Sequence, residues 1–253
     1  MKVTISPKYE NERTAIERVL NGTYTPLLTY CNKRNTVEKI EINGKPYVLK
    51  KFKPTGLFNG IIYTLLRKSK AQRAYEHAGF LLANGIDTAT PVAYAEQSRL
   101  GIFRRGYFLS EFIDAPLASE IIYDAENKVP ADIKERFGID LAVFIFNLHS
   151  GGIIPLDLNP NNIFYKRDDS GKFHLSLIDI NRMETGKPPK LSKAMRNFFQ
   201  LGISSWTLLY TVPHYAWRRK FDLDDCTYHI LRWRNKWERN RRLKERFRRL
   251  FRK

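Results

Sequence analysis

The chain has 253 residues and carries 44 lysines and arginines against 26 aspartates and glutamates, a net charge of +18. Apolar residues make up 43% and aromatic residues 13% of it, which excludes intrinsic disorder over most of the chain. Two cysteines are too few for a disulfide-stapled scaffold or a structural zinc site of cysteines alone, and they suit a reducing cytoplasm. The excess positive charge indicates an anionic partner: nucleic acid, an anionic membrane surface or a phosphorylated substrate.

The predicted elements of residues 1–113 are mostly strands. Apolar runs predict strands at 25–30, 37–42 and 47–52, and Asn43-Gly44 is a strong signal for a two-residue hairpin. Apolar residues at helical spacing predict one main helix over 65–84, and two more strands follow at 91–96 and 106–112. The first ten residues hold no apolar segment, so no secretory signal is expected. These elements predict a five-stranded antiparallel lobe with one main helix.

Residues 114–216 predict a second, mainly helical lobe. A helix is expected at 132–149, and two short strands at 162–165 and 173–178 are joined by a turn. The uncharged stretch 197–217 is long enough to span a bilayer, but its polar residues and proline favour a buried helix of a globular core. The predicted fold class is therefore α+β, with two lobes.

More than half of the excess charge lies in the last part of the chain. Residues 217–253 hold 15 basic and 5 acidic side chains, a net of +10, and the rest of the chain carries +8. Apolar residues recur there at helical spacing, with a bend or step expected near Asn240: Ile230, Trp233 and Trp237, then Leu243, Phe247 and Leu250. This predicts a basic amphipathic helix that packs on the domain, lies in the headgroups of an anionic membrane, or contacts nucleic acid.

The sharpest motif runs from Asp157 to Asn162 and is followed, seventeen residues later, by Asp179 at the end of an apolar strand. Phosphoryl transfer needs such a set: one aspartate orients and deprotonates the attacking hydroxyl, while the asparagine and second aspartate hold magnesium at the phosphates. The order D-x-x-x-x-N and then D is that of the protein-kinase catalytic loop and metal-binding triplet. The alternative, two unrelated surface loops, is disfavoured by the strand-turn-strand spacing.

A kinase also needs a strand lysine that faces the α- and β-phosphates and pairs with a glutamate of the next helix. Lys50 is favoured, because Leu49, Lys51 and Lys53 are expected to form the outer face of the strand; Lys51 remains the competitor. Glu76 is the expected partner, since it is the only acidic residue between Glu41 and Asp87.

These motifs resemble those of bacterial lipopolysaccharide core kinases, in particular those acting on the inner-core sugar Kdo. The resemblance covers residues 22–215 and is carried by 48–50, 70–76, 85–86 with 90–93, 148–149 with 152–153, 157–162 and 177–182. It implies a protein-kinase-like fold, the use of ATP and Mg²⁺, and phosphorylation of a sugar hydroxyl of the lipid A-linked core at the cytoplasmic membrane face. It also implies the site residues: Asp157 as catalytic base, Asn162 and Asp179 as metal ligands, Lys50 with Glu76 positioning ATP, and Ser110, Glu111, Phe112 and Ile113 as the hinge beside adenine.

Several features depart from the wider kinase pattern. Pro155 replaces the usual histidine before the catalytic aspartate, and Asn181, which tolerates a left-handed backbone, replaces the glycine of the triplet. No glycine-rich loop exists, so Lys33 and Arg34 are candidates for covering the phosphates. About fifteen residues separate Arg182 from the apolar helix at 197, which is short for a peptide-binding segment.

A basic stretch follows Asp179. Arg182, Lys187 and Lys190, with Lys193 and Arg196 beyond them, form either a solvated loop or a cradle for an acceptor carboxylate or phosphate. His149 is expected to be a structural residue at a helix end.

The sequence thus predicts an ATP- and magnesium-dependent phosphotransferase with an alcohol acceptor, acting on Kdo of Kdo-lipid A. It is expected to be peripheral on the inner face of the cytoplasmic membrane, without nucleic acid. The alternatives are a kinase-fold enzyme acting on heptose, another small molecule or protein, and a non-catalytic basic binding module. The intact kinase set argues against the last.

Overall fold

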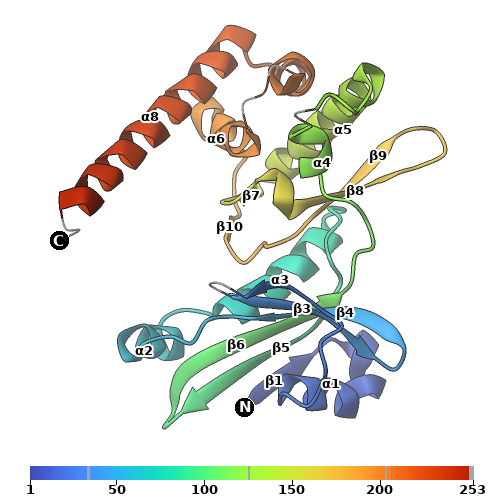
Figure 1. Cartoon of the computed structure of the whole chain (residues 1–253), viewed down its shortest axis with the longest axis vertical. Helices are drawn as coiled ribbons and strands as arrows, with labels where there is room; N and C mark the ends of the chain where they lie inside the picture. The colour runs from blue at the N-terminus through green and yellow to red at the C-terminus, as the bar shows by residue number, and fades with distance from the viewer. Residues whose placement is uncertain (33–34, 125, 203, 205, 251–253) are drawn as a thin grey trace. The chain divides into compact units, whose positions relative to one another are not determined.

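The computed structural model describes residues 1–32, 35–124, 126–202, 204 and 206–250, and its chain divides into two compact units (Figure 1). The first unit comprises Met1–Asp114 and Ser176–Arg182, and the second comprises Ala115–Leu175 and Met183–Lys253. Asp179 therefore belongs to the first unit, whereas Asp157 and Asn162 belong to the second.

The first unit is built on a six-stranded antiparallel sheet in the order β1-β5-β6-β4-β3-β2. Its strands are β1 (Lys2–Ile5), β2 (Leu28–Asn32), β3 (Thr36–Ile42), β4 (Lys45–Lys51), β5 (Pro91–Arg99) and β6 (Ile102–Glu111). The prediction of five strands was wrong because β1 was missed. This strand has only four residues, so its alternation of polar and apolar side chains is too short to stand out, and it pairs with β5, which lies far along the chain.

The hairpin between β3 and β4 confirms the Asn43-Gly44 signal. Both residues have positive φ, 51° and 76°, as the type I′ turn of a two-residue hairpin requires. The hairpin sets the register of β4, in which Val37 faces Lys50 across the ladder. Because side chains alternate along a strand, Lys50 and Leu49 lie on opposite faces of the sheet.

Helices cover both faces of this sheet. The short helix η1 (Pro7–Glu12) and α1 (Arg13–Leu20) pack on the face that contains the fully buried Leu49, which corrects the expectation that Leu49 lies on an outer face. On the Lys50 face, α3 (Lys70–Ala83) packs against β5 and β6 (Figure 1).

The predicted helix over 65–84 is in fact two helices. Leu65 is the last residue of α2 (Leu57–Leu65), and α3 begins after Ser69, whose side chain accepts a hydrogen bond of 3.1 Å from the Gln72 amide. This N-cap satisfies a backbone N–H that the first turn of a helix leaves unpaired, so α3 begins here as a separate helix and does not continue α2.

The second unit is mainly helical, as predicted. Its elements are α4 (Ser119–Ile122), α5 (Ala131–Ser150), β7 (Ile154–Pro155), η2 (Pro160–Asn162), β8 (Ile163–Arg167), β9 (Phe173–Leu177, whose last two residues belong to the first unit), β10 (Met183–Glu184), α6 (Leu191–Leu201), η3 (Thr207–Thr211), α7 (Val212–Arg219) and α8 (Leu223–Leu250). Strand β8 pairs with β9, and β7 pairs with β10.

The expectation of one buried helix over 197–217 was wrong. Helix α6 ends at Leu201, where Gly202 adopts a φ of 95°, and helical structure resumes in η3 and α7. Within the described residues, no helix has both the length and the apolarity needed to cross a membrane.

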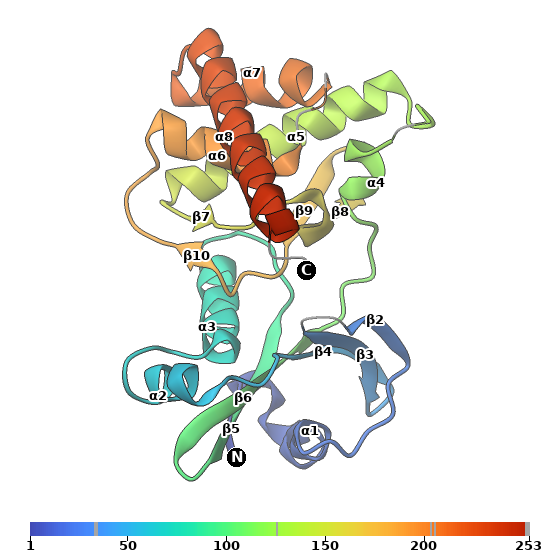
Figure 2. The same cartoon turned by 60° about the vertical axis from the view of Figure 1, so that its left-hand side comes forward.

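The basic helix α8 starts later than residue 217. Lys220 is left-handed with a φ of 52°, and the Asp222 carboxylate accepts a 2.9 Å bond from the Asp225 amide at the start of α8. Helix α8 then runs through Asn240 without interruption, contrary to the expected step, and packs along α6 (Figure 2).

Candidate active site

Lys50 and Asp179 form an ion pair inside the first unit. The Lys50 ammonium lies 2.6 Å from Asp179 Oδ1, and the side chains are 14% and 34% exposed. The same ammonium stands 5.5 Å from the centroid of the Phe52 ring. Partial burial strengthens a charge-assisted bond of this kind relative to one in water. The structure therefore brings together two residues that the sequence selected independently.

The expected pair between Lys50 and Glu76 is not formed. Glu76 instead accepts from Lys68 at 2.8 Å and from the side-chain amide of Gln72 at 3.0 Å. Gln72 is one turn earlier on α3, and such i, i+4 neighbours meet on a helix surface. Glu76 is thus bound by residues close to it in sequence, Lys68 and Gln72, whereas Lys50 is bound by Asp179.

Lys51, the competing lysine, belongs to a different network. Its ammonium lies 2.9 Å from the Glu38 carboxylate and donates to the Tyr24 hydroxyl at 2.9 Å. Glu38 is 7% exposed. Although burial opposes the charged form, the bonds to Tyr24 and Glu38 raise the pKa of Lys51. Lys51 therefore stabilises the sheet on the α1 side.

The backbone at Asp179 is left-handed, with a φ of 55°. Asn181, expected to carry this conformation, does not have a positive φ; its side-chain amide instead donates to Asp179 Oδ1. Aspartate is one of the few residues besides glycine that adopts this conformation singly. In this conformation the carboxylate contacts both Lys50 and Asn181.

Two side chains tie the strand end around Asp179 to the rest of the first unit. The buried Thr88 hydroxyl donates to the Leu177 carbonyl at 2.5 Å, and His77 Nδ1 lies 2.6 Å from the Ile180 carbonyl. Because a carbonyl only accepts, the bond assigns the His77 proton to Nδ1. Sequence reasoning missed both residues, since neither belongs to a motif.

In the second unit, Asp157 is exposed and its own loop orients it. The Asn159 side-chain amide donates to Asp157 Oδ1 at 3.1 Å, and the Asn162 amide donates to the Asp157 carbonyl at 2.9 Å. Asn159 also accepts from the Asn161 amide, which starts the short helix η2. The asparagines of the motif thus fix both the backbone and the carboxylate of Asp157.

A buried network supports this loop from below. Asn197 on α6 donates to the Pro155 carbonyl at 2.8 Å and to Gln200 Oε1 at 2.9 Å, so its Oδ1 must face His149 Nε2, 2.9 Å away. His149 therefore carries its proton on Nε2, and its Nδ1 accepts from the Tyr215 hydroxyl at 2.6 Å. Burial lowers the pKa of His149 to about 4. The prediction of a structural His149 agrees with these contacts.

Gln200 completes the support on both sides of Asp157. Its amide donates to the Leu156 carbonyl at 2.8 Å, and its oxygen accepts from the Leu158 amide at 3.4 Å. The residues flanking the carboxylate are therefore both fixed to α6. No motif of the sequence indicates this role for Asn197 or Gln200.

The expected hinge lies at the end of β6. The Glu111 carboxylate accepts from Tyr9 and, at 3.2 Å, from Lys8, so its side chain is directed to η1. Partial burial opposes the charged form, but hydrogen bonds that include Tyr9 and Lys8 lower the pKa of Glu111. Ile113 follows in an irregular, partly buried segment.

The remaining basic candidates are dispersed. Lys33 and Arg34 lie outside the described residues. Arg182, Lys187 and Lys190 are all exposed, the first in the first unit and the others in the second. Lys193 pairs with Glu184 at 2.5 Å, so it is neutralised.

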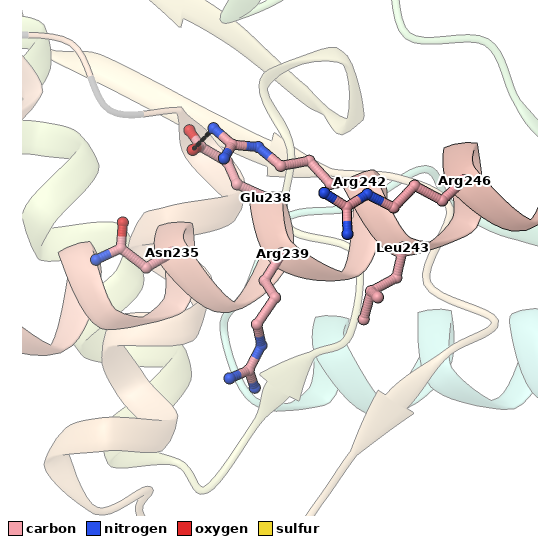
Figure 3. A pocket seen from close by; sticks show the side chains of 6 residues that line it. All are labelled: Asn235, Glu238, Arg239, Arg242, Leu243 and Arg246. Carbon is pink, nitrogen blue, oxygen red and sulfur yellow. Dashed lines mark ion pairs between the residues drawn. The ribbon is translucent and has the colours of Figure 1, made fainter.

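Most of the basic tail lies on α8. A hollow of about 420 Å³ runs along this helix and is lined by Asn235, Glu238, Arg239, Arg242, Leu243 and Arg246 (Figure 3). Glu238 lies 4.0 Å from Arg242 and 3.1 Å from Arg234. Leu243 and Phe247 are 46% and 60% exposed, so apolar side chains lie exposed among these cations.

The oxygen donors expected for magnesium suit that ion. Magnesium prefers carboxylate and carbonyl oxygens, and often keeps several waters beside one or two protein ligands. Asp179 supplies a carboxylate; Asn162 uses its amide nitrogen within the loop, so its Oδ1 is the atom available to a cation. Across the described ranges, no three His, Cys, Asp or Glu side chains gather as a metal cluster.

Comparison with known proteins gives one family and one fold. The model of the lipopolysaccharide kinase (Kdo/WaaP) family matches residues 39–216. A solved structure titled "WaaP in complex with acyl carrier protein" is similar with a TM-score of 0.66 and 15% identity, covering 95% of this chain and 99% of that chain. At this identity the likeness shows a shared fold. No curated protein matches the chain.

Proposed function

Because the chain belongs to the lipopolysaccharide kinase (Kdo/WaaP) family, we propose that it transfers the terminal phosphoryl group of ATP to a hydroxyl of Kdo in Kdo-lipid A. The fold that it shares with WaaP supports a protein-kinase-like architecture. The observation that carries the proposal is the ion pair of Lys50 with Asp179, in which a strand lysine meets the expected metal-binding carboxylate.

Asp157 acts on the acceptor. Asn159 holds Oδ1, which leaves Oδ2 to accept a hydrogen bond from the sugar hydroxyl. As the hydroxyl oxygen forms its bond to the γ-phosphorus, the bond from phosphorus to the ADP oxygen breaks and the hydroxyl proton passes to Asp157. The exposure of Asp157 suits a base that must reach a bulky acceptor.

Lys50, Asp179 and Asn162 act on the nucleotide. Lys50 binds the α- and β-phosphates, and Asp179 with Asn162 Oδ1 would hold magnesium. Bound magnesium neutralises charge that develops on the phosphate oxygens. Asp179 is the carboxylate that pairs with Lys50, a role that was expected of Glu76. The end of β6, from Ser110 to Ile113, would contact adenine through its backbone.

We place the enzyme on the inner face of the cytoplasmic membrane, with α8 as the contact. The exposed Leu243 and Phe247, flanked by Arg239, Arg242 and Arg246, match a helix that lies among anionic headgroups. Deletion of residues 243–253 should weaken binding to vesicles of phosphatidylglycerol and phosphatidylcholine, and not to phosphatidylcholine alone. Equal partitioning of both proteins would contradict the membrane contact.

The activity is tested by transfer of labelled phosphate from ATP to Kdo-lipid A, a heptosylated core and a generic protein, offered separately. Label should enter Kdo-lipid A. The variant Asp157→Ala should transfer none while it still binds ATP. Label in the heptosylated core alone would correct the acceptor, and label in protein alone would refute a sugar kinase.

A further inference from the structure

A hollow of about 620 Å³ opens directly beside Asp157 in the second unit. Its walls come from the Asp157 loop, from α6 and from the middle of α8. A cavity of this size accommodates a sugar with a charged substituent. Nothing in the motifs pointed to α8, which was expected to pack or to bind membrane.

Two cations line this hollow without a carboxylate partner. The indole of Trp233 is fixed by a 2.7 Å bond from Nε1 to the Ser192 carbonyl. The Arg196 guanidinium lies 5.5 Å and the Lys236 ammonium 4.9 Å from the centroid of this ring. In the part of the chain that the structure describes, neither cation forms an ion pair with a carboxylate. Against the single charge of Asp157, the hollow is net positive.

The hollow also contains a half-exposed indole. Trp237 is 49% exposed, although Arg241 lies over its ring at 5.0 Å and Phe199 stands 6.3 Å away. The C–H groups on one face of a pyranose form an apolar surface that packs on such a ring, while its hydroxyls stay in water. An indole beside a catalytic carboxylate therefore suits a sugar.

From these contacts we infer that the hollow is the acceptor subsite, with Arg196 and Lys236 binding an anionic group of the sugar substrate and Trp237 packing on its ring. The inference rests on the proposed function, because it takes Asp157 as the base. It assigns part of the specificity to α8. A neutral sugar without an anionic substituent would leave both cations unpaired, so the subsite selects an acidic acceptor. The anionic group is either the Kdo carboxylate or a lipid A phosphate.

Steady-state kinetics of full-length variants test the subsite. Arg196→Gln, Lys236→Gln and Trp237→Ala should each raise the KM for Kdo-lipid A about 10-fold, with the KM for ATP unchanged. Arg232→Gln, a matched loss of charge at an exposed position of α8 that does not line the hollow, should behave as wild type. Thermal melting of each variant confirms that it is folded.

Two altered acceptors identify the anionic group. If the carboxylate is bound, reducing it to an alcohol should abolish the difference between wild type and Arg196→Gln. If a phosphate is bound, removing the lipid A phosphates should do so instead.

The outcomes separate the two proposals. If wild type is active and the acceptor KM does not change in any of the three variants, the subsite is refuted and the kinase stands. A rise confined to the KM for ATP would show that the hollow takes nucleotide, which also refutes it. Failure of wild type to phosphorylate any lipopolysaccharide acceptor would refute the proposed function itself.

Discussion

Replacing Asn197 by alanine should show that a side chain remote from substrate holds the catalytic loop. Asn197, on α6, is 1% exposed and bonds to the Pro155 carbonyl and to His149, as well as to Gln200 of the same helix. Pro155 is two residues before Asp157, and His149 is fully buried. Alanine would remove all three bonds and leave their partners without them.

The magnitude follows from the groups left unpaired. Two of them, His149 Nε2–H and the Pro155 carbonyl, are buried, and each buried polar group without a partner costs about 1–3 kcal/mol. The variant should therefore lose about 4 kcal/mol in its free energy of unfolding. Typical domains have about 5–15 kcal/mol, so the variant should still fold at low temperature.

Activity should fall even in the folded fraction. With Pro155 released, Gln200 is the remaining tie from α6 to the backbone on either side of Asp157, and a small displacement of a base lowers turnover. We expect kcat to fall about 10-fold with the KM for ATP unchanged. Urea denaturation measures the stability, and phosphate transfer at a temperature where the variant is folded measures kcat.

Asn161→Ala is the matched control, since Asn161 is exposed in the same loop. It should change the free energy of unfolding by less than about 0.5 kcal/mol and keep kcat. A loss below about 1 kcal/mol in Asn197→Ala would refute the network as a source of stability. Wild-type kcat in the folded variant would refute its role in holding the loop.

Three further predictions follow from single contacts. Lys50→Met should lower kcat/KM for ATP about 100-fold with little change in melting temperature, whereas Lys51→Met should lower the melting temperature and keep activity in the folded protein. Burial lowers the pKa of His149 to about 4, so as the pH falls this histidine takes up a proton in the unfolded protein before it does so in the folded protein. The free energy of unfolding should therefore be full above about pH 6.5 and decline by up to about 1.4 kcal/mol per pH unit towards pH 4. His149→Gln should flatten that decline. Gly152 has a φ of 68°, and a Cβ there would lie 1.7 Å from a carbonyl oxygen, so Gly152→Ala should destabilise the protein by more than about 2 kcal/mol in thermal melts, while Gly79→Ala, with open space on α3, should not.

The parts of the fold that the sequence predicted have local causes. Asn43-Gly44 specifies a turn through the backbone preferences of two adjacent residues, and the structure has that turn. Helix α5 was predicted to within a residue or so from its apolar spacing. The Asp157 motif holds its own carboxylate through Asn159 and its own carbonyl through Asn162, which is five positions away, so a short run of residues contains the geometry.

The parts that were missed depend on distant partners. Strand β1 forms by pairing with the edge of β5, and this pairing cannot be read from either segment alone. The Glu76 prediction used elimination among acidic residues, but it did not consider that Asp179, 129 positions away, could bind Lys50. The supports at His77, Asn197 and Gln200 are ordinary polar residues in their own helices; only tertiary contact gives them a role.

The apolar spacing of α8 predicts its packing over only part of its length. Ile230 is buried and Trp233 bonds to Ser192 at the start of α6, as the packed face predicted. However, α8 has 28 residues and α6 only 11, so their lengths at 1.5 Å per residue differ by roughly 25 Å. The distal half of α8 therefore outruns α6, and its apolar residues Leu243 and Phe247 remain exposed.

The basic residues behind the net charge of +18 differ in what they contact: some pair with carboxylates or carbonyls inside the protein, and others, in the described part of the chain, have no such partner. Lys51 and Lys68 are paired with carboxylates, and Arg219 is used inside the protein, where it donates to Tyr215 and to the Pro189 carbonyl. On α8, Glu238 is shared by Arg234 and Arg242 and Glu245 pairs with Arg241, so the many other cations leave the helix strongly positive. Fields are screened within about 8 Å at physiological salt, so a partner senses such a local patch and not the total. Under the two proposals, these patches would act separately: Arg196 and Lys236 on an anionic group at Asp157, and the outer part of α8 on anionic lipid. A lipid-anchored acidic sugar would present both kinds of anion at once, so a single helix would carry both surfaces.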